Sequence, residues 1–111
     1  GVNAASPAIQ DYFARHTDSA GAPPDSWASA ITYASLEMLA QSVERVGLDH
    51  EKLAQELSTG TFSTIIGDVK LEDNQLRDLW WVGQWQNGTF VAVNPADKDG
   101  AVAPVVPKPN W

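Results

Sequence analysis

Apolar residues at helical spacing occupy much of the first sixty positions of the chain. The pair Ser6-Pro7 is typical of a helix start, because proline is well accommodated in a first helical turn. The apolar residues that follow predict a short amphipathic helix reaching about residues 15–17. A small-residue linker comes next, and its Pro23-Pro24 pair cannot continue a helix.

The pattern then predicts a long helix from about residue 27 to residue 45 or 46. Asp25 or Ser26 is expected to cap its start, and Gly47 is expected to close it in the left-handed conformation. Apolar and small residues trace two adjacent lines along this helix, so its apolar face is broad and much of it should be buried. A third helix is expected after the capping residue Asp49, ending near residues 58–60.

After residue 60 the pattern changes to one typical of strands. Residues 62–71 are rich in Ile, Val and Thr and predict one or two short strands, with a break at Gly67-Asp68 and a turn at 72–74. Residues 79–85 and 89–93 flank Asn87-Gly88, which predicts a β-hairpin with a type I′ turn.

The last segment, residues 98–111, contains three prolines and predicts an extended tail. This tail either packs against another surface or makes no packing contacts. A structure of three helices and a few short strands is thin, and the last third of the chain carries most of its tryptophans. The expected fold class is therefore α/β, as part of a larger α/β assembly.

Composition narrows the classes of function. Seven basic residues against fourteen acidic ones give a formal net charge of −7, so no basic surface is available to bind nucleic acid or an anionic membrane. The absence of cysteine excludes disulfides, thiolate catalysis and cysteine-ligated metals. No apolar stretch is long enough to span a bilayer.

No candidate catalytic or metal-binding group withstands closer inspection of its spacing. His16 and His50 lack the partners of a metal motif, and no nucleotide-binding or nucleophile motif occurs. The segment 97–100 resembles part of a calcium loop, but the position that needs a bidentate Glu is Val106. The acidic residues between 68 and 78 are better explained as a solvated turn. We therefore expect neither an enzyme nor a cofactor.

Several segments, taken in order, resemble one protein family. The helix containing Thr32–Leu39, the acidic-capped segment 48–53 and the stretch 61–71 are similar to the late part of type I periplasmic solute-binding proteins of ABC importers, including the branched-chain amino acid-binding proteins. The segment 82–88 is similar to the last hairpin of that family, and residues 107–111 to the chain end of one subgroup.

The resemblance implies a partial Rossmann-like lobe of the type I periplasmic-binding-protein fold. Residues 1–75 would belong to the late part of lobe 1, and residues 76–111 would supply a hinge strand, the hairpin of lobe 2 and the C-terminal tail. Two lobes of such a protein close around a small ligand in the cleft between them. Most polar ligand contacts come from earlier segments of the family, whereas this chain would contribute an apolar wall at Trp27 or Ala28. Alternatively, Trp27 only packs at the helix end.

Three functions therefore stay open. The first is the C-terminal portion of a periplasmic or extracellular solute-binding protein whose full-length parent passes an amino acid-like molecule to an ABC permease. The second is the ligand-sensing lobe of a receptor or regulator. The third is a stand-alone α/β interaction protein that buries its aromatic residues by self-association.

Overall fold

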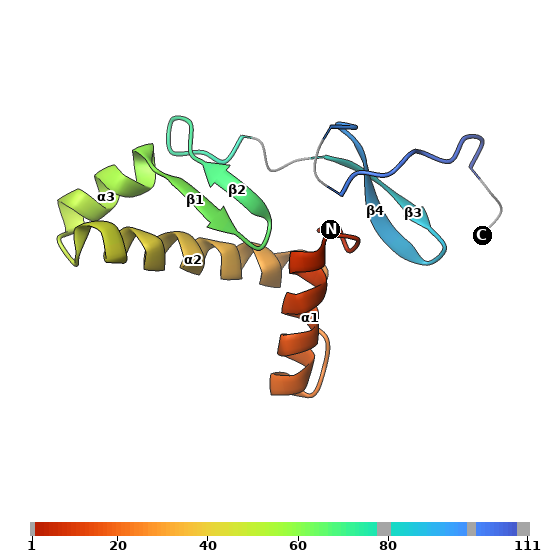
Figure 1. Ribbon diagram of the computed structural model, residues 1–111, viewed down its shortest axis with the longest axis horizontal. Helices are drawn as coiled ribbons and strands as arrows, with labels where there is room; N and C mark the ends of the chain where they lie inside the picture. Colours follow the sequence, from red (N-terminus) through yellow and green to blue (C-terminus); the bar gives the residue numbers. More distant parts are fainter. Residues whose placement is uncertain (1, 78–80, 98–99, 109–111) are drawn as a thin grey trace. The chain divides into compact units, whose positions relative to one another are not determined.

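The computed structural model of the protein describes residues 2–77, 81–97 and 100–108. These contain three helices and two separate two-stranded antiparallel sheets, which confirms the α/β fold class and the partial lobe (Figure 1). The chain forms two compact units, described separately below. The first contains residues 1–26 together with 81–111, and the second contains residues 27–80. The chain therefore passes twice from one unit to the other.

The second unit contains the long helix α2 (Ala28–Val46) and the shorter helix α3 (His50–Thr59). Asp49 caps α3 as predicted, because its side chain accepts a hydrogen bond from the backbone N–H of Lys52 at 3.0 Å. The predicted cap of α2 is wrong. The N-cap is Trp27, whose side chain makes no capping bond, and its carbonyl accepts the first helical hydrogen bond from Ile31.

Gly47 ends α2, but not in the conformation expected of it. Its φ of 77° is positive as predicted, whereas its ψ of −160° lies outside the left-handed helical region. This combination of angles is essentially restricted to glycine. The Gly47 N–H still satisfies the Val43 carbonyl at 2.8 Å, so the chain leaves the helix in an extended direction without losing the terminal hydrogen bond.

Strands β1 (Thr61–Thr64) and β2 (Gly67–Lys70) form a tight antiparallel hairpin. The predicted break at Gly67-Asp68 is two residues too late, because the turn lies at Ile65 and Ile66. Two isoleucines do not resemble a turn in sequence, but Ile65 is buried and Ile66 packs against the apolar core. Burial of these side chains explains why they occupy a position where polar residues are usual.

Polar side chains of α2 hold the free edge of β1. The Glu37 carboxylate accepts from the Ile65 N–H at 2.8 Å, and the Gln41 amide both donates to the Ser63 carbonyl at 2.9 Å and accepts from its N–H at 3.3 Å. One turn further on, Arg45 donates to the Thr61 carbonyl at 3.0 Å.

The spacing of these contacts follows from the rise per residue of an α-helix and of a β-strand. Four helical residues rise about 6 Å and two strand residues about 6.8 Å, so positions 37, 41 and 45 match alternate residues of an antiparallel strand. The edge of β1 is thereby paired without a third strand. The apolar core of the unit lies beneath this contact, where Met38, Phe62 and Val69 are buried.

The first unit contains α1 (Pro7–Ala20), with Ser6 as its N-cap and Pro7 in its first turn, as predicted. The helix runs beyond the predicted end because Gly21 adopts the left-handed conformation (φ 73°, ψ 6°) and donates to the Thr17 carbonyl at 2.8 Å. In the sequence, Gly21 was expected only as part of the following linker.

Strands β3 (Val82–Gln86) and β4 (Thr89–Asn94) form the hairpin of the first unit, which confirms the hairpin prediction over the described residues. Residues 79 and 80 of the predicted first strand lie outside the described part of the chain. Asn87 and Gly88 both have positive φ, 51° and 79°, as a type I′ turn requires.

The segment before α1 lies against this hairpin and is held by hydrogen bonds of the segment's own backbone. Val2 donates to the Ser26 carbonyl at 2.8 Å, and Ala4 donates to the Phe90 carbonyl at 3.3 Å. Asn3, between them, is fully buried. Its side-chain oxygen accepts from Ala92 N–H at 3.3 Å, and its side-chain nitrogen donates to the Gly100 carbonyl at 3.1 Å.

The tail is extended over its described part and packs on the hairpin. Gln84 forms two hydrogen bonds with the backbone of Val105, at 3.0 Å and 2.9 Å, and Gln86 donates to the Ala103 carbonyl at 3.0 Å. Alternate strand residues point to the same face of a sheet, so two glutamines hold the tail over one face of β3.

Candidate functional site

The two residues predicted to contact a ligand lie where α2 begins. Trp27 is the N-cap residue and 52% of it is exposed, and Ala28 is the first helical residue and is also exposed. A large apolar side chain left half exposed at a helix start is available to contact another molecule. Both residues belong to the second unit, and their role in ligand binding stays a prediction.

The acidic residues considered in the sequence are spread over different surroundings. Asp68 lies in β2, and Glu72 and Asp73 lie 4.0 Å and 3.6 Å from the guanidinium of Arg77. Asp73 and Asn74 have positive φ in a tight turn closed by the bridge between residues 72 and 75, which confirms the predicted turn. Two exposed carboxylates share one guanidinium, as is usual in a solvated turn.

The histidines also occupy ordinary structural positions. A ring nitrogen of His16 lies 3.1 Å from the Ala22 carbonyl and holds the end of α1 to the linker, and His50 is the first residue of α3, as expected. Over residues 2–77, 81–97 and 100–108, no three His, Cys, Asp or Glu side chains gather in a way that could hold a metal ion.

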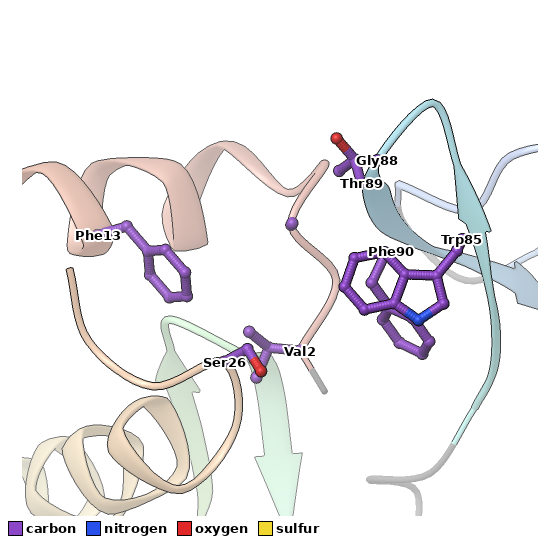
Figure 2. A pocket seen from close by; sticks show the side chains of 8 residues that line it. Val2, Phe13, Ser26, Trp85, Gly88, Thr89 and Phe90 are labelled. Atoms are coloured by element: carbon purple, nitrogen blue, oxygen red, sulfur yellow. The ribbon is translucent and has the colours of Figure 1, made fainter. Parts of the chain in front are cut away.

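A cavity of about 370 Å³ that is open to solvent lies within the first unit, and no pattern in the sequence indicated it. Its walls come from the N-terminal segment, α1, the end of the linker and the β3–β4 hairpin (Figure 2). The lining residues are Val2, Ala4, Phe13, Ser26, Trp85, Gly88, Thr89 and Phe90. Three aromatic side chains, one each from α1, β3 and β4, therefore line one hollow.

The aromatic wall of the hairpin has a defined geometry. Trp85 and Phe90 are cross-strand partners, and their rings meet edge to face with centroids 5.6 Å apart and planes at 65° (Figure 2). Gly83 makes this possible, because a Cβ built there would overlap the Phe90 ring. The only sequence signal for this arrangement was a glycine inside a strand, which often marks a close approach.

Comparison with known proteins decides the family. A sequence model described as periplasmic binding protein matches residues 2–89, which is most of the chain. This chain belongs to the periplasmic binding protein family. The match runs from the N-terminal segment through both helices of the second unit and into the β3–β4 hairpin. No curated protein and no solved structure gives a significant match.

Membership of the periplasmic binding protein family gives the chain a ligand-binding role of the kind exercised outside the cytoplasm. Proteins of this family are generally not enzymes, in agreement with the expectation from the sequence. Within the described residues, no helix combines the length and apolar character needed to cross a membrane.

Proposed function

We propose that this chain is the C-terminal portion of a solute-binding protein that delivers an amino acid or similar small molecule to an ABC permease. The observation that carries the proposal is the family match over residues 2–89. It is supported by the order of the segments resembling branched-chain amino acid-binding proteins, which extends from the start of α2 to the final hairpin.

The proposal assigns residues 1–75 to the late part of lobe 1, and residues 76–111 to a hinge strand, the lobe 2 hairpin and the tail. Its support is the order of the segments that resemble the family. Of the two passages between the compact units, near residues 26 and 80, only the second lies close to the proposed boundary at residues 75 and 76.

Trp27 and Ala28 are proposed to form an apolar wall of the ligand site. Trp27 supplies a large surface for the apolar part of a ligand, and Ala28 leaves room beside it. The charged ends of an amino acid need charged or backbone partners, which the family resemblance places in earlier segments.

The test is calorimetric titration of amino acids into the intact protein that carries this chain. Replacing Trp27 with alanine should weaken binding about tenfold or more, since a large aromatic contact is lost. Leu36→Ala is the control, because Leu36 is 59% exposed on α2 and the proposal gives it no ligand contact. Equal affinities of the two variants would refute the assignment of Trp27.

A further inference from the structure

We infer that the cavity of the first unit is a binding site for a neutral aromatic small molecule of one or two rings. The residues that line this site differ from those of the wall proposed at Trp27, and the inference does not depend on the proposed function. It rests on the size of the cavity, the contacts that hold its walls together and the chemistry of its lining.

The size of the cavity matches a small ligand. Its volume of about 370 Å³ lies near the lower end of the range typical of small-molecule pockets, about 300–1,000 Å³. Figure 2 shows Phe13 on one side of the hollow and the rings of Trp85 and Phe90 on the other, with Val2 between them. A planar molecule can therefore contact aromatic side chains on both sides.

The walls are fixed by contacts that do not involve a ligand. Hydrogen bonds from Val2 to Ser26 and from Ala4 to Phe90 hold the N-terminal segment against the linker and β4. The edge-to-face contact with Trp85, together with the space left by Gly83, fixes the Phe90 ring. A site formed in advance does not have to be ordered by the ligand, which favours binding.

The lining of the cavity disfavours a charged ligand. None of the described residues that line the cavity is acidic or basic, so neither a carboxylate nor an ammonium group would find a partner there. Ser26 and Thr89 are among the lining residues, and their side chains carry hydroxyl groups able to form hydrogen bonds with a phenol-like or amide-like group. Trp85 remains 53% exposed and presents much of its surface to an incoming ring.

The experiment compares two ligands with the same ring system. The 111-residue chain is titrated by calorimetry with 2-naphthol, which is neutral at pH 7, and with naphthalene-2-sulfonate, which is anionic. We expect 2-naphthol to bind about tenfold or more tightly than the sulfonate, because no described lining residue can pair with the sulfonate and the chain carries a net charge of −7. Equal affinities, or no binding of 2-naphthol up to its solubility limit, would overturn the inference.

Two variants test whether 2-naphthol binds in the cavity. Trp85→Ala removes an aromatic wall, and Ala4→Leu fills the cavity while leaving Trp85 in place; each should weaken 2-naphthol binding about tenfold. Leu36→Ala, on the exposed side of α2, should leave it unchanged. Circular dichroism establishes that each variant is folded. Unchanged binding in both folded cavity variants would overturn the assignment, as would protection of Trp85 by self-association of the chain without uptake of 2-naphthol.

Discussion

The side-chain oxygen of Asn3 accepts a hydrogen bond from the backbone N–H of Ala92, 89 positions later in the chain, at 3.3 Å. The same carboxamide donates to the carbonyl of Gly100, so one buried side chain joins the N-terminal segment, β4 and the start of the tail. Since buried polar groups must be paired, this residue specifies how three distant segments assemble.

Replacing Asn3 with alanine should therefore destabilise the protein clearly. The Ala92 N–H and the Gly100 carbonyl would lose their partner in a buried place, at a cost of about 1–3 kcal/mol. Urea unfolding measures the change. Gln10→Ala is the matched control, because Gln10 also donates a side-chain hydrogen bond to the backbone, at Ala4, but is exposed. A loss for Asn3→Ala no larger than for Gln10→Ala would contradict this role.

The contact between α2 and β1 makes a second prediction. Gln41→Ala removes both hydrogen bonds to the Ser63 backbone and leaves that part of the strand edge to water. We expect a loss of about 1 kcal/mol in the free energy of unfolding, since the site is partly exposed. Hydrogen exchange of the Ser63 amide should also become faster. Gln55→Ala, on the exposed surface of α3, provides the control and should change neither quantity.

Gly83 and Phe90 are coupled sterically, which a double-mutant cycle can test. Gly83→Ala places a Cβ inside the volume of the Phe90 ring and should cost about 1–3 kcal/mol of stability. Phe90→Ala removes the ring, so the same glycine substitution should then cost much less. Additive effects of the two substitutions in chemical denaturation would show that the rings and strand are not packed as described.

The turn of the β3–β4 hairpin gives a prediction with a built-in rescue. Asn87 has a φ of 51°, a conformation that alanine adopts only with strain, so Asn87→Ala should destabilise the hairpin by about 1 kcal/mol. Asn87→Gly should keep the turn, because glycine adopts positive φ freely. Thermal unfolding of both variants provides the comparison, and equal losses would argue against a type I′ turn.

Local signals in the sequence predicted most of the secondary structure. Pro7, Asp49 and the Asn87-Gly88 pair act within a few residues of themselves, so their effects were readable without knowing the fold. The predictions failed where another segment intervenes. Ile65 and Ile66 form a turn because the core of the second unit accepts their side chains. Such a contact cannot be derived from the periodicity of apolar residues.

The candidate sites were less predictable than the fold for the same reason. Trp27 was singled out through a resemblance to a family, and its place at the start of α2 agrees with the expected position without testing its role. The cavity depends on Phe13, Trp85 and Phe90. The pairing of β3 with β4 brings Trp85 beside Phe90, and the hydrogen bonds of Val2 and Ala4 hold the N-terminal segment against the linker and β4. In the sequence, nothing distinguishes Asn3 from other polar residues outside the predicted helices.

The proposed division of the parent protein predicts the behaviour of the isolated 111-residue chain toward amino acids. If earlier segments hold the amino and carboxyl groups, this chain alone should show no measurable calorimetric binding of free amino acids. Micromolar affinity would contradict that division. Retention of 2-naphthol binding by the same sample would show that the absence of amino acid binding does not result from a misfolded chain.

Native mass spectrometry of the protein isolated from its source tests the proposed function most directly. An antibody against the β3–β4 hairpin would capture the protein from the extracytoplasmic fraction. The account predicts a species heavier than the 12.0 kDa of this chain, carrying a small amino acid-like molecule that is released on denaturation. A 12.0 kDa species found in the cytoplasmic fraction, with no bound molecule, would contradict it.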